Sequence, residues 1–366
     1  MSGPATDDPA RLPVACVMLS AARGGLEQSL FDYCEALLVE RHPVHAVIHP
    51  RWVGRAALEQ LPLTTIAPLT NRNEWDPFAV GRLRNALRAA APRLVLTIGR
   101  RASTLTRRAR RRLPHLPQVG VTPNYSLGPL IGLDHVLATT LDLKDALIAA
   151  GQPPEQISVI PNLVRAPPDV AMIGPHPAGV PVIGALGRFV PKKGFADLLE
   201  ALARLRDRGL RFEARLAGSG PEEAALRARA AQLKLERRVR FLGWVEDKRS
   251  FFGALDLFCV PSREEPFGIV VLEGMAHGRA TIATDAPGPR EIVRHGVDGL
   301  LVPSAAPDAL AAALGELLVH PERRLALARA GRETVRARFD LPVVAKRISA
   351  ALGQAIERRP SPDSAT

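Results

Sequence analysis

The feature that most constrains the fold is a repeated alternation of short apolar runs with segments whose apolar residues recur at helical spacing. The expected strands of a first series lie at 14–19, 44–49, 94–99, 119–122, 135–139 and 157–160, and those of a second series at 182–186, 212–216, 239–242, 257–260, 281–283 and 299–302. Strands that alternate with helices form parallel sheets covered by helices. The sequence therefore predicts an α/β protein with two doubly wound, Rossmann-like domains.

The segment between the two series, residues 166–181 (APPDVAMIGPHPAGVP), is expected to mark the domain boundary. Its prolines and glycines exclude a helix or a central strand and are typical of a hinge. We expect a first domain at 1–170, a second at 171–340, and at 341–366 a C-terminal helix that packs back towards the first domain and ends in a disordered tail. Two such domains would face each other across a cleft at the carboxyl ends of their strands.

The composition excludes several classes of protein. With 46% hydrophobic and 23% charged residues, the chain is typical of an ordinary globular protein and not of a disordered or fibrous one. We expect neither a membrane span nor a signal peptide, because no apolar run is long enough and the first residues lack the required pattern. Cys16, Cys34 and Cys259 lie far apart in apolar runs, which favours buried reduced thiols in a cytoplasmic protein and no metal site.

Positive charge is concentrated in one short segment. The chain has 49 basic and 37 acidic residues, a formal net charge of +12. Seven of the basic residues form what we call the arginine cluster, namely Arg100, Arg101, Arg107, Arg108, Arg110, Arg111 and Arg112. Such a cluster attracts anions, and the partner that we expect for it is the anionic inner face of the cytoplasmic membrane. A solvated helix in an arginine-rich protein is the alternative, and nucleic acid is not expected because aromatic residues make up only 4% of the chain.

The stretch PSREEPFGIVVLEGMAHG, residues 261–278, is the most informative for chemistry. It follows an expected strand, and a helix is expected to begin near Gly268, so that free backbone N–H groups could bind phosphate. Glu265 and Glu273 would instead accept hydrogen bonds from sugar or ribose hydroxyls. The alternative is that Glu265 only favours the helix dipole and that Glu273 lies on a solvated face.

The segment GRFVPKKG, residues 187–194, places two cations directly after the first strand of the second domain. Arg188 can bind phosphate oxygens with its guanidinium fork, while Lys193 acts as a mobile point charge, so the pair suits a diphosphate. Lysines are rare in this chain, which weakens the alternative of a merely basic loop.

Two glycine pairs also lie between an expected strand and an expected helix. Gly218 and Gly220 are compatible with close approach of the backbone to a ligand, or with a simple tight turn. Gly24 and Gly25 follow the first strand but lack the third glycine of the dinucleotide fingerprint, so a nicotinamide cofactor is disfavoured.

In this order, the motifs resemble the family-4 retaining glycosyltransferases of the GT-B fold, over residues 14–358. The resemblance rests on the Gly24–Gly25 loop, the PN turn at 161–162, GRFVPKKG, GSGPEEAAL, RFLGWV, EPFGIVVLE, APGPREIV and DGLLVP. It implies transfer of a hexose-type sugar from a UDP-, GDP- or ADP-linked donor to a hydroxyl of a glycan or glycolipid, with the anomeric configuration retained. No metal and no cofactor besides the donor are implied. The resemblance suggests an enzyme that assembles lipopolysaccharide or another envelope polysaccharide. It implies that the first domain binds the acceptor and that the second binds the donor.

The resemblance also implies roles for individual residues. The implied catalytic residues are Glu265, Arg188 and Lys193, of which the two cations neutralise the donor diphosphate and Glu265 contacts the donor sugar. The implied donor-binding residues are Gly24, Gly25, Arg188, Lys193, Gly218, Gly220, Val245, Phe267, Gly268, Ile269 and Glu273. Among them, Glu273 would hold the ribose hydroxyls and Val245 would lie beside the base.

One departure affects the acceptor side. Where the family often has a histidine that faces the reacting sugar, this chain has Pro123, which can neither donate a hydrogen bond nor accept a proton. Asn124 or Tyr125 could supply that contact. The alternatives are an epimerase or hydrolase of the nucleotide sugar with the same fold, and a non-catalytic subunit that binds nucleotide sugars.

Overall fold

The computed structural model describes residues 11–20, 25–122, 125–168 and 179–358 of the chain. They cluster into two compact units, one formed by residues 1–162 and 341–366 and the other by residues 163–340. The division lies earlier than the boundary expected at residue 170, because Val164 and Ala166 are hydrogen-bonded to Phe339 and Asp340 of the second unit. Most of the expected hinge, the expected tail, Gly24, Pro123 and Asn124 lie outside the described residues.

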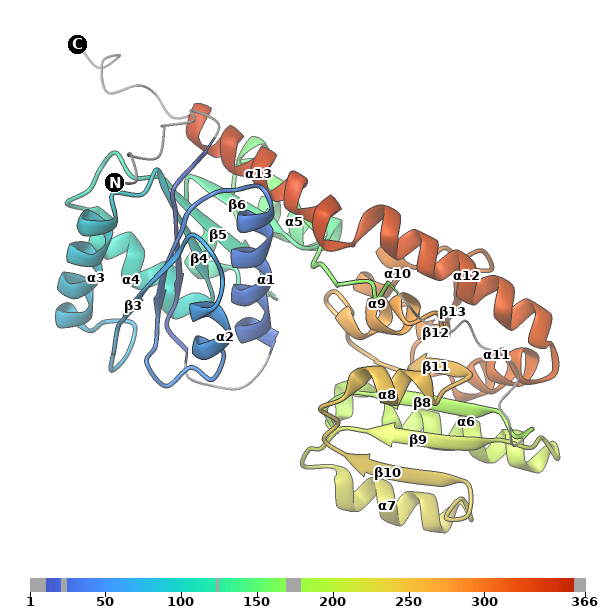
Figure 1. Ribbon diagram of the computed structural model, residues 1–366. Coiled ribbons are helices and arrows are strands. Elements are labelled where there is room, and N and C mark those ends of the chain that lie inside the picture. The colour runs from blue at the N-terminus through green and yellow to red at the C-terminus, as the bar shows by residue number, and fades with distance from the viewer. Residues whose placement is uncertain (1–10, 21–24, 123–124, 169–178, 359–366) are drawn as a thin grey trace. The chain divides into compact units, whose positions relative to one another are not determined.

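Unit 1 contains a seven-stranded parallel sheet in the order β3-β2-β1-β4-β5-β6-β7 (Figure 1). Its strands are β1 (Val14–Met18), β2 (Val44–Ile48), β3 (Thr64–Pro68), β4 (Leu94–Ile98), β5 (Gln118–Thr122), β6 (His135–Ala138) and β7 (Ile157–Val159). The sequence did not predict β3, which is an edge strand that is only partly buried and ends in a proline. Edge strands tolerate proline and carry a weak apolar pattern, which is why periodicity missed it.

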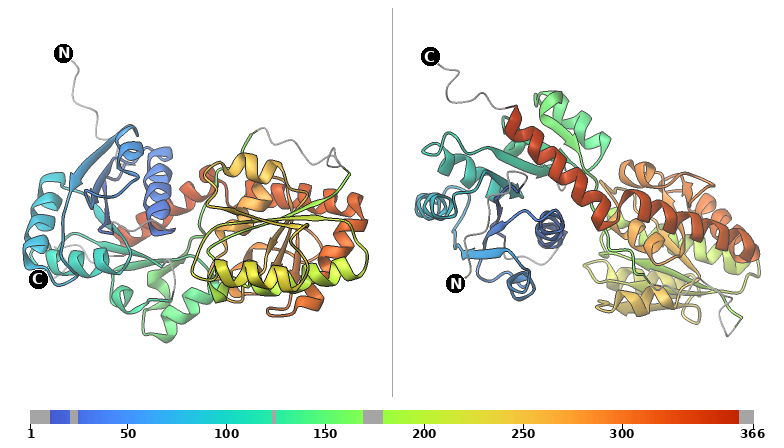
Figure 2. Two further views of the ribbon diagram at one scale, coloured as in Figure 1. Left: turned by 90° about the horizontal axis from the view of Figure 1, so that it is seen from below. Right: turned by 45° about the horizontal axis from the view of Figure 1, so that its top comes forward.

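The helices of unit 1 cover both faces of this sheet. They are α1 (Gly25–Val39), α2 (Arg55–Glu59), α3 (Pro77–Ala90), α4 (Arg100–Arg110), α5 (Leu141–Ala149) and α13 (Leu341–Glu357). α3 and α4 pack side by side over one apolar cluster, and Asp76 caps α3 by accepting hydrogen bonds from the N–H groups of Phe78 and Ala79. α13, the last helix of the chain, packs against α1 and crosses it at an angle (Figure 2).

Unit 2 contains a six-stranded parallel sheet in the order β10-β9-β8-β11-β12-β13. Its strands are β8 (Val182–Leu186), β9 (Glu213–Ala217), β10 (Val239–Gly243), β11 (Leu257–Val260), β12 (Ala280–Thr284) and β13 (Leu300–Val302). Its helices are α6 (Phe195–Asp207), α7 (Glu223–Gln232), α8 (Lys248–Gly253), α9 (Ile269–Ala276), α10 (Pro287–Ile292), α11 (Pro307–Val319) and α12 (Pro321–Arg338). Both sheets confirm the expected α/β class.

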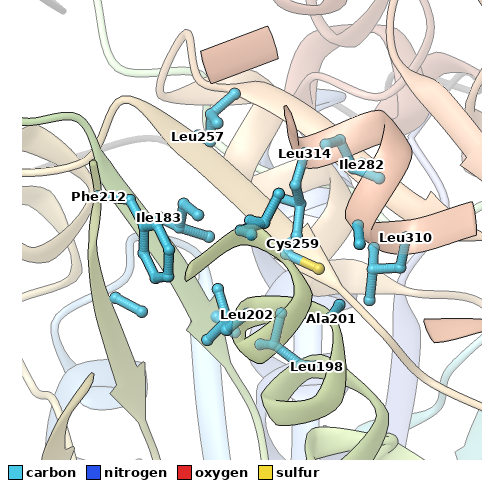
Figure 3. Close-up of a cluster of buried hydrophobic side chains, with 14 of the residues drawn as sticks. Ile183, Leu198, Ala201, Leu202, Phe212, Leu257, Cys259, Ile282, Leu310 and Leu314 are labelled. Atoms are coloured by element: carbon cyan, nitrogen blue, oxygen red, sulfur yellow. The ribbon is translucent and has the colours of Figure 1, made fainter. Parts of the chain in front are cut away.

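The core of unit 2 lies on both faces of its sheet, as the alternation along β11 requires. Leu257 and Cys259 face the cluster formed with α6 and α11 (Figure 3), whereas Phe258 and Val260 face the cluster formed with α8, α9 and α12. Burial raises the pKa of the Cys259 thiol far above its ordinary value, so this cysteine is an inert core residue. Neither unit contains, among its described helices, one with the length and apolar character needed to cross a bilayer.

Candidate functional site

The strand order of unit 2 reverses between β8 and β11, so the loops that leave these two strands diverge to opposite faces of the sheet. Such a switch point opens a crevice at the carboxyl ends of the strands, where open α/β sheets bind ligands. The loop after β8 carries Arg188 and Lys193, and the loop after β11 carries Glu265. The topology alone therefore brings these sequence-predicted residues to one edge.

Lys193 and Glu265 form an ion pair that joins these two loops. The Lys193 Nζ lies 2.5 Å from Glu265 Oε2, and Ser262 Oγ donates to the same oxygen at 3.2 Å. Glu265 is 8% exposed, and the side chain of Lys193 is 22% exposed. The reading of Glu265 as no more than an acid favoured by the helix dipole does not account for this pairing.

The two loops are fastened to each other by further contacts. The backbone N–H groups of Arg263 and Glu264 donate to the carbonyl of Lys192 at 2.8 and 3.2 Å. The Arg263 guanidinium binds Asp197 of α6 through two hydrogen bonds of 2.7 and 2.8 Å, and this pairing raises the pKa of Arg263. The loop that holds Glu265 is thus fixed against the turn that holds Lys193.

Glycines make this close approach feasible. Gly194 has φ +66°, and a Cβ there would lie 1.9 Å from the Pro261 carbonyl oxygen. In the next loop, Gly218 has φ +129°, and a Cβ there would lie 1.8 Å from the Gly187 oxygen. A Cβ at Gly220 would lie 2.3 Å from the Phe189 oxygen. Backbone packing within unit 2 is therefore sufficient to require these glycines.

The N-terminus of α9 faces the same loops. Gly268 precedes the helix with φ +94°, and the backbone N–H groups of residues 267–270 have no hydrogen-bond acceptor among the described residues. The carbonyl of Glu265 accepts from the N–H of Gly288 at 3.0 Å, which ties the approach to α9 to the start of α10. Unpaired amides at the positive end of a helix can bind an anion, as the sequence predicted for Phe267, Gly268 and Ile269.

Glu273 lies in the second turn of α9. One of its carboxylate oxygens is ion-paired, and the other has no hydrogen-bond partner among the described residues. Oε1 is ion-paired with Lys248, the first residue of α8, whereas Oε2 is buried and has no hydrogen-bond partner within the described residues. The Glu273 side chain is 14% exposed, so it does not lie on a solvated face. A buried carboxylate oxygen without a donor suits a ligand that brings a hydroxyl or N–H group.

The remaining predicted residues of unit 2 lie around this edge in different environments. Arg188 is exposed and has no ion-pair partner in the described part of the chain, so its charge is available to a ligand. Val245 follows β10 and packs against the cluster that contains Phe267. No contact of the Val245 side chain identifies a base-binding surface.

Unit 1 holds the other predicted residues. Gly25 is the first residue of α1, and Gly24 and Asn124 lie outside the described residues. Tyr125 is half exposed, and its hydroxyl donates to Asp142 of α5. The structure gives Tyr125 a local partner but does not assign it a role towards a substrate.

The arginine cluster is not a uniform solvated face. Arg110 is 14% exposed and is paired with Asp134 at 2.6 Å, while Arg100 is paired with Glu74 at 2.8 Å. Arg107 and Arg108 donate to backbone carbonyls, and the Arg108 guanidinium lies 4.6 Å from the centre of the Trp75 ring. Hydrogen bonds to carbonyls leave the positive charge uncompensated, so most of the cluster still contributes to the surface potential.

Sequence reasoning missed four residues of the unit 2 site, namely Asp197, Lys248, Ser262 and Arg263. Asp197 with Arg263, and Lys248 with Glu273, are pairs far apart in the chain, so no local motif contains them. Only the scarcity of lysine could have drawn attention to Lys248. No cluster of His, Cys, Asp or Glu that could hold a metal ion occurs within the described ranges.

Comparison with known proteins gives consistent matches. The family model of the group 1 glycosyl transferases matches residues 173–334. The chain is 33% identical over 320 residues to the lipopolysaccharide core biosynthesis glycosyltransferase LpsD of Rhizobium meliloti (strain 1021), an alignment that covers 86% of this chain and 91% of LpsD.

Two further matches are more distant or partial. The phosphatidyl-myo-inositol mannosyltransferase of Mycobacterium leprae (strain TN) is 38% identical over 197 residues, which is 52% of this chain and 51% of that protein. The crystal structure of Anabaena HepE in complex with UDP and glucose superimposes with a TM-score of 0.79 at 23% identity, and the match covers 94% of this chain and 100% of HepE. This structural likeness shows that the two proteins share a fold.

Proposed function

The chain belongs to the group 1 glycosyl transferases, and we propose that it transfers a hexose-type sugar from a nucleoside-diphosphate sugar to a hydroxyl of a cell-envelope glycan or glycolipid. The observation that carries this proposal is the match to LpsD over most of both chains. The mannosyltransferase match supports an envelope acceptor, and lipopolysaccharide core is the acceptor class to test first. The three free cysteines, all buried, support a cytoplasmic location.

Unit 2 is proposed to bind the donor. The diphosphate would lie against the unpaired amides of residues 267–270, with Lys193 and Arg188 neutralising its charge. Glu265 would accept a hydrogen bond from the donor sugar, and Glu273 Oε2 would accept one from a ribose hydroxyl. Gly218 and Gly220 would let the backbone approach the phosphates. In unit 1, Gly25 would contact the donor phosphates through its backbone N–H group, and Tyr125 would contact the acceptor.

We propose that the reaction retains the anomeric configuration and needs no metal. The acceptor oxygen forms a bond to the anomeric carbon as the bond to the phosphate oxygen breaks, and the hydroxyl proton passes to the departing phosphate. Lys193, Arg188 and the amides of α9 would stabilise the developing negative charge, so the required cationic charge is present in the chain itself. Equal turnover with and without EDTA, and an α-linked product from an α-linked donor by NMR, would support both statements.

The donor site is tested by thermal shift with UDP, GDP, ADP and their sugars. A ligand that binds only the folded protein raises its melting temperature by mass action. We expect a shift with one nucleotide family that is lost in Lys193→Ala and kept in Lys192→Ala, which removes the adjacent exposed lysine. No shift with any nucleotide contradicts the proposal. Binding without turnover favours a non-catalytic subunit, and release of free sugar or of an epimer without an acceptor favours a hydrolase or an epimerase.

A second part of the proposal is that unit 1 binds an anionic membrane surface. Residues 69–112 contain twelve arginines and two acidic residues, which gives ten of the chain's twelve net positive charges. Apart from β4, these residues form α3, α4 and the loops next to them, and both helices lie on one face of the sheet (Figure 1). On the same loop and helix, Trp75 is 60% exposed and Phe78 is 76% exposed. Exposed aromatic residues within a basic surface are typical of proteins that bind the membrane interface.

Vesicle flotation tests this membrane surface. We expect binding to phosphatidylglycerol-containing vesicles at low salt and none to pure phosphatidylcholine, because each basic residue near an anionic surface contributes about 1 kcal/mol. Trp75→Ala/Phe78→Ala should weaken binding, whereas Trp244→Ala, which removes an even more exposed indole from unit 2, should not. Equal flotation of all three proteins, or no binding by the wild type, contradicts the proposal.

A further inference from the structure

α8 contacts Glu273 directly through the side chain of Lys248 and indirectly through His277. The ring of Phe252 in α8 stacks on His277 with centroids 4.5 Å apart, and His277 Nδ1 donates to the Glu273 carbonyl at 2.8 Å. From the start of the same helix, Lys248 is ion-paired with Oε1 of the Glu273 carboxylate. Phe251 and Phe252 are buried and anchor α8, so the Lys248 ion pair orients the Glu273 carboxylate relative to a rigid helix.

This arrangement leaves one carboxylate oxygen of Glu273 without a hydrogen-bond donor in the described part of the chain. Lys248 occupies Oε1, and Oε2 is buried without a donor in the described part of the chain. Leaving a buried acceptor unpaired is costly, so a ligand that supplies a hydroxyl to Oε2 gains more than one that lacks it. A carboxylate that could rotate freely into solvent would be hydrated and would give a smaller difference.

On this basis we infer that Lys248 is a positioning residue that makes the nucleoside site selective for ribose over 2′-deoxyribose. The inference rests on the proposed function, which places the donor ribose at Glu273. Lys248 does not touch the reacting atoms; it acts by holding Glu273 Oε1, so that Oε2 meets the 2′-hydroxyl, which 2′-deoxyribose lacks. Its side chain is 49% exposed, so its removal leaves the core of unit 2 intact.

The test is the ratio of dissociation constants for ribose and 2′-deoxyribose nucleotides, measured by isothermal titration calorimetry. The ligands are whichever of UDP, GDP and ADP binds, and its 2′-deoxy counterpart. A hydrogen bond to a charged group corresponds to about ten- to hundredfold in affinity, so we expect the wild type to prefer the ribonucleotide by that factor. In Lys248→Ala the preference should fall several-fold, through weaker ribonucleotide binding, and Lys248→Arg should restore it.

Two further variants separate this role from a structural one. Glu273→Gln should lose the preference as Lys248→Ala does, because the amide lacks the charged acceptor. Lys346→Ala, which removes an exposed lysine from α13 of unit 1, should leave the ratio unchanged. If Lys248→Ala keeps the wild-type ratio, or weakens both nucleotides equally, the inference is wrong while the donor site stands. If the wild type binds none of the nucleoside diphosphates, the proposed function fails, and the inference fails with it.

Discussion

Neutralising Glu265 should separate nucleotide binding from sugar transfer. In the free protein the Lys193 Nζ is ion-paired with Glu265 Oε2 at 2.5 Å, and both side chains are largely shielded from water. A bound diphosphate must share that ammonium with the carboxylate and must also tolerate its negative charge. Glu265→Gln removes the charge and keeps the shape, so Lys193 becomes freer to bind phosphate.

The magnitudes follow from the strength of charged hydrogen bonds, about 1.5–3 kcal/mol each. Weakening the competing pair by about 1 kcal/mol should tighten binding of the nucleoside diphosphate about fivefold in Glu265→Gln. Lys193→Ala removes the phosphate contact itself and should weaken binding about ten- to hundredfold. Both variants should lose transfer, Glu265→Gln because its contact to the donor sugar is impaired.

Calorimetry with the nucleoside diphosphate and a nucleotide-release assay with donor and acceptor measure the two effects. Lys192→Ala is the matched control, since its side chain is exposed and only its backbone carbonyl contacts the Glu265 loop. If Glu265→Gln weakens nucleotide binding as much as Lys193→Ala does, Glu265 supports the nucleotide directly and the reasoning is refuted.

Three further predictions concern stability. Burial lowers the pKa of His135 to about 4, so below about pH 6.5 the unfolded chain binds a proton that the folded state does not. The free energy of unfolding of the wild type should therefore be about 1–2 kcal/mol lower at pH 5 than at pH 7.5, after allowance for screening. Urea unfolding of His135→Gln at the two pH values should show a correspondingly smaller difference. Gly218→Ala should cost at least about 3 kcal/mol, because of its clash with the Gly187 oxygen, whereas Gly209→Ala, with φ +75° and open space, should cost about 1 kcal/mol; equal costs would contradict the close approach. Leu352→Ala, on the buried side of α13, should lower the free energy of unfolding by about 2–4 kcal/mol, whereas Lys346→Ala should lower it by less than about 0.5 kcal/mol. Equal melting temperatures of the two variants would contradict the packing of α13.

Most of the fold could be predicted because buried parallel strands leave short apolar runs that need no long-range information. The strands β8 and β11 are examples, and their expected bounds agree with the structure. β3 was missed because an exposed edge strand is under weaker constraint than a central one. The boundary between the units was placed late because the expected hinge begins with residues that are hydrogen-bonded to the end of unit 2.

Only the site residues that stand in local sequence motifs could be predicted from the sequence. Lys193 and Glu265 stand in recognisable loops, and the sheet topology brings those loops together. The contacts of Lys248 with Glu273 and of Arg263 with Asp197 depend on how helices pack, which the sequence pattern does not report. The arginine run illustrates the same limit, since Arg110 is largely buried on Asp134 while its neighbours Arg111 and Arg112 are exposed.

A crystal structure of the protein with its nucleoside diphosphate would show directly whether the donor binds where we propose. We predict that the diphosphate lies within hydrogen-bond distance of Lys193 Nζ and of the backbone N–H groups at the start of α9, with a ribose hydroxyl on Glu273 Oε2. A nucleotide bound away from the carboxyl ends of β8 and β11, or one whose phosphates contact neither Lys193 nor these amides, would contradict it.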